Sequence, residues 1–175
     1  PVAAPAPAAA APAAAPSPAP AAPAAPAPLT RPGLVATDTL NAADTAWMMT
    51  STALVLLMTL PGIALFYAGM VRKKSVINTM ACVVAIAAWV SLLWFAVGYS
   101  WAFTPGNSLL GGGDRLWFAG MEYAKASGMV AVSHIAPQIP ESVYAMFQLT
   151  FAIITAALVV GAFVERMKFA AMFVF

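Results

Sequence analysis

Three long stretches without a charged side chain set the pattern of the chain. They contain 27, 29 and 23 residues, and polar segments separate them. An α-helix rises about 1.5 Å per residue, so each stretch is long enough to cross the hydrocarbon core of a bilayer, which is about 30 Å thick. We therefore predict three membrane-spanning helices over about 45–71, 76–103 and 142–164.

Positive charges follow the first and third stretches and predict how the helices are oriented. The basic turn RKK lies at 72–74, between the first two stretches, and Arg166 and Lys168 follow the third. Lys and Arg are enriched on the cytoplasmic side of membrane proteins. We therefore expect three alternating crossings of a bacterial-type cell (inner) membrane, with the N-terminus outside. Another apolar run begins at 169 and predicts the start of a fourth helix.

The first part of the chain differs in composition from the rest. Residues 1–33 contain 11 of the 15 prolines, mostly set among alanines. Proline interrupts helices, and the segment has little bulky apolar surface to offset the entropy of ordering. We expect a disordered Ala/Pro-rich tail over 1–40 and a membrane domain over 41–175, with Asp44 or Thr45 as the first N-cap. The chain does not begin with methionine, which fits either a removed signal peptide or a piece of a longer chain.

Pro61 and Gly62 predict an irregularity in the middle of the first span. Proline removes a backbone hydrogen bond, so a kink is expected near 58–61. Gly62 and Gly69 are seven residues apart on one face, where small residues permit close packing of another helix. Packing is the favoured interpretation of this face, ahead of a direct role in binding a substrate.

The segment 104–141 is expected to be an outer loop. It contains three consecutive glycines at 111–113 and three prolines, which are typical of loops. His134, the only histidine, is expected to be a surface residue rather than a metal ligand. The tryptophans in the second half of the second span are interpreted as anchors at the membrane interface.

Composition narrows the classes of function. Hydrophobic residues make up 62% of the chain and charged residues 8%, far below the roughly 25% that soluble proteins carry. The net charge of +2 comes from cations that flank apolar spans, so we expect no nucleic-acid partner. Cys82 is the single cysteine and cannot form a disulfide within the chain. The spans hold no group suited to acid, base or nucleophilic catalysis, so we expect neither an enzyme nor a cofactor.

Two phenylalanines in the third span are the main candidates for a functional site. Phe147 and Phe151 are four residues apart and therefore share one helical face, with Gln148 one step round and Thr155 one turn further. Two such rings can hold a small cation by cation–π attraction, worth about 0.5–2 kcal/mol. The same spacing is also common in ordinary packing, so the spacing alone leaves both interpretations open.

Three sequence motifs, taken in order, resemble the first three helices of the ammonium transporter (Amt/MEP/Rh) family. They are ALVLLMTLPGIALFYAGMVRKKSV, WFAVGYSWAF and FQLTFAIITAALVVGAFVERMKF. The resemblance covers about residues 43–175. It implies an all-α membrane protein, namely the N-terminal part of a polytopic helical bundle of the ammonium transporter fold.

The resemblance also implies a function and roles for particular residues. It implies homotrimers in membrane lipid, in which each subunit transports ammonium/ammonia through a narrow apolar pore. By position Phe151 would belong to the phenylalanine gate, Phe147 would lie beside it at an outer aromatic cation site, and Gln148 would be a nearby polar group. Phe66 and Tyr67 would lie towards the inner end with a structural role. A PII-type regulator is the implied cytoplasmic partner.

The family's remaining helices, the second gate phenylalanine and the two pore histidines would follow Phe175, so transport would belong to a longer protein. A sensor of the same fold is an alternative, which a signalling domain beyond position 175 would favour. A non-transporting membrane anchor subunit is another alternative.

Overall fold

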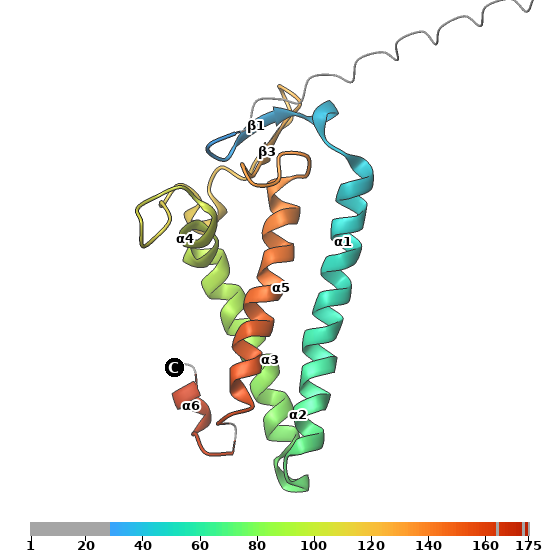
Figure 1. The fold of residues 1–175 in the computed structure, drawn as a ribbon, viewed down its shortest axis with the longest axis vertical. Helices are drawn as coiled ribbons and strands as arrows, with labels where there is room; N and C mark the ends of the chain where they lie inside the picture. The colour runs from blue at the N-terminus through green and yellow to red at the C-terminus, as the bar shows by residue number, and fades with distance from the viewer. Residues whose placement is uncertain (1–28, 164, 173, 175) are drawn as a thin grey trace, which may run out of the picture.

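The computed structural model describes residues 29–163, 165–172 and 174, and the prediction of a tail over residues 1–28 lies outside them. Three long helical segments stand side by side, with a small sheet over one end (Figure 1). All three are long and apolar enough to cross a membrane, over Ala42–Met70, Lys73–Phe103 and Glu141–Val160. The predicted helical membrane architecture is therefore confirmed for the described residues.

The first segment contains α1 (Ala42–Leu57) and α2 (Ala64–Met70). Asn41 is the N-cap of α1, since its side-chain oxygen accepts hydrogen bonds from the backbone N–H of Ala43 at 2.9 Å and of Asp44 at 3.2 Å. The prediction of Asp44 or Thr45 as the cap was therefore wrong by three residues or more. An asparagine just before the helix satisfies backbone donors that have no partner within the first turn.

A π-helical turn, Met58–Ile63, joins α1 to α2 and contains Pro61, so the predicted irregularity is present. Close packing beside it depends on alanines rather than glycines. Ala64 and Ala68 are 2% and 8% exposed. A Cβ atom at Gly69 would meet nothing within 4 Å, so that glycine is not required for a close approach among the described residues.

The second and third segments follow the same pattern of long apolar helices. After a 3-10 turn, Lys73–Ser75, the second segment consists of α3 (Val76–Leu93), a π-helical turn (Trp94–Gly98) and α4 (Tyr99–Phe103). The third is α5 (Glu141–Val160), and α6 (Phe169–Met172) lies at the start of the run predicted to open a fourth helix.

Helix α5 lies between the other two segments and contacts both α1 and α3 (Figure 1). One face of α5 is buried by this packing. Its members alternate small and medium-sized side chains, and they are Ala145, Thr150, Ile153, Ala157 and Val160. Small residues let the backbones of membrane helices approach closely. Such close packing stabilises helix association in a bilayer, because lipid tails are as apolar as the side chains and supply no hydrophobic driving force.

A three-stranded antiparallel sheet, in the order β1-β3-β2, covers one end of the helices. It consists of β1 (Gly33–Ala36), β2 (Tyr123–Ala124) and β3 (Met129–Val132). Strand β1 lies within residues 1–40, which were expected to form a disordered tail. Ordered structure therefore begins earlier in the chain than position 41. We call this end of the molecule the sheet end, and the opposite end, at Arg72 to Lys74, the basic end.

The glycine-rich part of the 104–140 loop folds back on the end of α4. The N–H of Gly111 donates to the carbonyl of Trp101 at 2.9 Å, and that of Gly112 donates to Thr104 at 3.2 Å. These bonds satisfy carbonyls at the end of the helix. A Cβ atom at Gly111 would lie 2.4 Å from the Trp101 oxygen, so only glycine fits this position without movement of the backbone.

Candidate functional site: the aromatic pair on α5

Phe147 and Phe151 lie together on one face of α5, as their spacing predicts. Their ring centroids are 5.1 Å apart and the ring planes are inclined at 71°, so the edge of one ring meets the face of the other. Edge-to-face contact is a preferred geometry for aromatic pairs. Phe147 is half-buried and Phe151 is 42% exposed.

The aromatic pair faces away from the packed side of α5. Thr150 and Ile153, on the packed side, are both about 2% exposed, whereas Phe151 and Leu158 are 42% and 53% exposed. An α-helix turns about 100° per residue, which places these two sets about 120° apart around the helix. The aromatic pair is therefore available to helices or molecules beyond the described residues.

Two polar groups accompany the aromatic pair. Gln148 is half-buried and lies next to Phe147 on α5. The hydroxyl of Thr155 donates to the carbonyl of Phe151 at 2.8 Å, within the same helix. The surroundings of the rings are thus largely apolar, with one amide close by.

A tryptophan of the second segment reaches α5 between the sheet end and the aromatic pair. The Nε1–H of Trp94 donates to the carbonyl of Ala145 at 3.2 Å. The ring also contacts those of Tyr99 and Phe103 at centroid distances of 6.0 Å. Trp94 therefore joins two helices, which corrects its interpretation as a membrane anchor, whereas Trp101 is 49% exposed and fits that interpretation.

A buried ion pair lies at the first residue of α5. Glu141 is fully buried, and its Oε2 is 3.0 Å from Nη2 of Arg115, whose side chain is 11% exposed. Glu141 Oε1 accepts hydrogen bonds from Arg115 Nε at 3.1 Å and from the Tyr99 hydroxyl at 3.0 Å. Sequence reasoning missed this ion pair. The signal available in the sequence was an acid directly before an apolar span, because an acid so placed usually has a partner.

His134 differs from its prediction as a surface residue. It is half-buried, and its Nδ1 atom is buried without a hydrogen-bond partner among the described residues. Within the described residues no group of three or more His, Cys, Asp or Glu side chains lies close enough to hold a metal ion.

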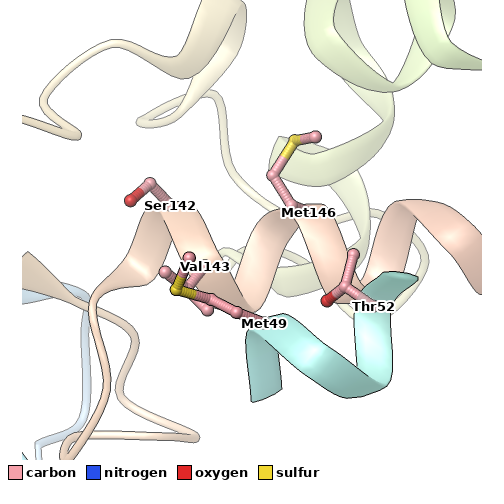
Figure 2. A pocket seen from close by; sticks show the side chains of 5 residues that line it. All are labelled: Met49, Thr52, Ser142, Val143 and Met146. Atoms are coloured by element: carbon pink, nitrogen blue, oxygen red, sulfur yellow. The ribbon is translucent and has the colours of Figure 1, made fainter. Parts of the chain in front are cut away.

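An apolar hollow lies between α1 and the start of α5. It has a volume of about 300 Å³ and is lined by Met49, Thr52, Ser142, Val143 and Met146 (Figure 2). A second hollow of about 380 Å³ shares Thr52 and Met146 and continues towards α3. Met146 precedes Phe147, so the hollows open about 100° round the helix from the aromatic pair. They contain no charged side chain.

At the basic end, α5 finishes against Tyr67. The Tyr67 hydroxyl donates to the carbonyl of Leu158 at 2.7 Å, which satisfies an acceptor in the last turn of the helix. A Cβ atom at Gly161 would lie 2.3 Å from Cε1 of Tyr67, so the ring occupies the space of a missing side chain. Tyr67 therefore connects two spans at the basic end.

These features define a class of protein. Three long apolar helical segments packed side by side, with a small sheet over one end, define a multi-pass helical membrane protein.

Comparison with known proteins identifies the family. The model of the Ammonium Transporter Family matches residues 46–175. The chain belongs to this family.

Named relatives agree with this assignment. The chain is 45% identical over 138 residues to a putative ammonium transporter of Methanothermobacter thermautotrophicus, a match that covers 78% of this chain and 32% of the relative. It is 42% identical over 137 residues to an ammonium transporter of Bacillus subtilis, with the same coverage. The chain thus spans about a third of the length of these curated relatives.

A solved structure shares the fold. The crystal structure of Candida albicans Mep2 matches with a TM-score of 0.67 and 30% sequence identity, over 78% of this chain and 28% of that chain.

Proposed function

We propose that this chain is the N-terminal part of a protein that transports ammonium/ammonia across the cell membrane. Each subunit would contain its own pore, and Phe147 and Phe151 would form the outer aromatic cation site and one half of a phenylalanine gate. The observation that carries this proposal is the contact of the two rings on the face of α5 that the other described helices leave uncovered. Gln148 supplies a nearby polar group.

The chemistry of the aromatic pair suits a small nitrogen cation. Aromatic faces attract such cations by about 0.5–2 kcal/mol, and more strongly where water is excluded. Beyond the rings the same face continues with apolar side chains such as Leu158. An apolar path strongly disfavours a bare ion, and low polarity favours the neutral form of a group that can lose a proton. The rings therefore collect the cation, and the apolar path passes the deprotonated species.

We also propose the arrangement of the whole protein. Residues 41–175 would belong to the transport domain and residues 1–40 would precede it. The basic turn at 72–74 would lie in the cytoplasm, which supports a sheet end outside the cell and an N-terminus on that side. The working protein would be a homotrimer, regulated at its cytoplasmic face by a PII-type partner.

Replacement of Phe151 by alanine in the full-length protein tests the gate. Loss of one ring removes a cation–π contact of about 0.5–2 kcal/mol, which corresponds to about a 2- to 30-fold loss of apparent affinity for ammonium. The measurement is uptake of labelled methylammonium, with ammonium and potassium as competitors, normalised to the amount of assembled trimer. Assembly should remain intact.

Phe66→Ala is the matched control, since Phe66 is also an exposed phenylalanine, at 61%, but lies at the basic end. Its uptake and selectivity should equal those of the wild type. Wild-type flux and selectivity in Phe151→Ala would contradict the assignment of the gate.

A further inference from the structure

The start of α5 is fixed by polar contacts to one buried carboxylate, that of Glu141. The carboxylate of Glu141 is fully buried and lies within hydrogen-bonding distance of three donor groups, namely Arg115 Nε, Arg115 Nη2 and the Tyr99 hydroxyl, at 3.0–3.1 Å. Oε2 has the ion-pair contact with Arg115 but no hydrogen bond among the described residues, and because the whole side chain is buried a passing cation does not reach it. Its role must be exerted through the elements that it joins.

The partner groups are themselves held in place. Arg115 Nη1 donates to the carbonyl of Ala119 at 3.2 Å, and the backbone N–H of Arg115 donates to Ser100 Oγ at 3.2 Å. The Ser100 hydroxyl in turn donates to the carbonyl of Gly112 at 2.7 Å. The ion pair thus connects α4, the glycine-rich loop and α5, which come from different parts of the chain.

The rest of α5 has fewer directional contacts with the other segments: Trp94 Nε1–H donates to the carbonyl of Ala145 at 3.2 Å, and the Tyr67 hydroxyl donates to that of Leu158 at 2.7 Å. Its packed face consists of small and aliphatic groups with one threonine, whose hydroxyl donates to its own helix at Phe147. Apolar packing opposes separation of two helices much more than a small rotation or a slide along the axis, because it has no preferred direction. The charged contacts at Glu141, together with the hydrogen bond from Trp94 to Ala145, therefore set the position of the aromatic pair.

The distance from the ion pair to the rings is short. Phe147 and Phe151 follow Glu141 by six and ten residues, about 9 and 15 Å along a straight helix. We infer that Arg115 and Glu141, with Tyr99, are positioning residues: they fix the rotation and height of α5 and so hold the Phe147–Phe151 pair in register with the pore. This inference rests on the proposed transport function.

The test compares variants of the full-length protein that differ in charge but little in shape. Glu141→Gln removes the charge of the acid, and Arg115→Lys keeps a cation but loses the paired geometry. The double variant Arg115→Met/Glu141→Leu replaces the ion pair by apolar side chains, which often restores stability. Glu122→Gln, an exposed acid of the same loop, is the matched control.

Uptake of labelled methylammonium gives the first readout, normalised to folded protein. We expect the KM of Glu141→Gln to rise by about tenfold, because small displacements of positioning groups have large effects, and that of Glu122→Gln to change by less than about twofold. Arg115→Lys should lie between them. The double variant should recover thermal stability but keep the raised KM. Recovery of both would show a merely structural role and overturn the inference.

Tyr99→Phe removes one hydrogen bond and leaves the ion pair, so it keeps the test decisive if Glu141→Gln fails to fold. Its KM should rise by about twofold to threefold. Tyr99→Phe loses one hydrogen bond to a charged group, and only part of the effect of that loss reaches the aromatic pair. An unchanged KM in folded Tyr99→Phe overturns the inference, whether or not Glu141→Gln folds.

A second readout does not depend on transport. Phe151→Cys, on a Cys82→Ala background, is labelled from outside by a water-soluble thiol reagent, and Glu141→Gln should change the labelling rate by about tenfold. A changed rate in a protein that takes up no methylammonium would support the positioning role while contradicting the proposed function. An unchanged rate in an actively transporting protein would contradict the positioning role alone.

Discussion

At the sheet end, α5 begins with a buried carboxylate that lies among three donor groups, whereas at the basic end it finishes against the ring of Tyr67. The first contact is ionic and directional. The second depends on shape, because the ring fills the space that a side chain at Gly161 would need. A single hydrogen bond, from Tyr67 to Leu158, adds direction at the basic end.

The difference indicates which end of the helix is fixed most firmly. Several charge-assisted bonds define both rotation and height, and each is worth more than a neutral bond. A ring over a glycine limits how closely two helices approach, but it can adjust by rotation about the side-chain torsions. The aromatic pair lies nearer to the firmly fixed end, as a site that requires defined geometry should.

The largest expected effect is that of Arg115→Ala. It leaves the fully buried Glu141 without its cation, which typically costs about 3–5 kcal/mol. The apparent melting temperature of the full-length protein should fall further than for any other single change described here. Lys125→Ala, at an exposed cation of the same loop, is the control and should leave it unchanged. Equal melting temperatures for both variants would contradict the importance of the ion pair.

Gly111→Ala is expected to have the next largest effect. The new Cβ atom would lie 2.4 Å from the Trp101 oxygen and 2.7 Å from the carbonyl oxygens of Ser100 and Thr104, all of them backbone atoms. Backbone cannot move aside without loss of helix bonds, so the cost should lie towards the upper part of about 1–3 kcal/mol. The same melting measurement tests it, and a change below that of Gly161→Ala would reverse the expected order.

Gly161→Ala should be milder although its contact is equally short. The nearest atom is Cε1 of Tyr67 at 2.3 Å, which belongs to a side chain that can swing away. The expected cost is about 1 kcal/mol, mainly the hydrogen bond from Tyr67 to Leu158 that such a movement breaks. Melting of Gly161→Ala in a Tyr67→Phe background checks this, because the hydrogen bond is already absent there and the added loss should be smaller.

The smallest effect is expected for Gly69→Ala. Nothing lies within 4 Å of the position of the new Cβ atom, and alanine favours a helix over glycine by about 0.5–1 kcal/mol. The melting temperature should therefore stay the same or rise slightly. A clear fall in the melting temperature would contradict the difference between Gly69 and the crowded glycines Gly111 and Gly161.

The spans were predictable because each residue contributes independently to the signal. A run of 27 residues without charge is informative whatever its partners are, and the faces of α5 follow from the helical repeat alone. The position of Phe147 beside Phe151 is therefore a local property of the sequence. The irregular turn around Pro61 is local for the same reason.

Contacts between distant segments were not predictable in this way. Arg115 and Glu141 are 26 residues apart, and the loop between them follows a path that the sequence does not define. Their pairing therefore left no periodic signal in the sequence. Strand β1 pairs with β3 over nearly 100 residues, in a register from Gly33 with Val132 to Ala36 with Met129. Four residues are too few for an alternating pattern to stand out, particularly next to a proline-rich segment.

Strand β1 lies at the sheet end, and helix α6 follows the basic end of α5, so the two elements lie at opposite ends of the three apolar segments (Figure 1). A molecule bound around Gly33 to Ala36 is therefore separated by the length of a helix from one bound at the basic end. Coupling between such molecules would require a conformational change along the helices that connect the two ends. Among those helices α5 is the central one, so the force that a ligand exerts at one surface would reach the other chiefly through it.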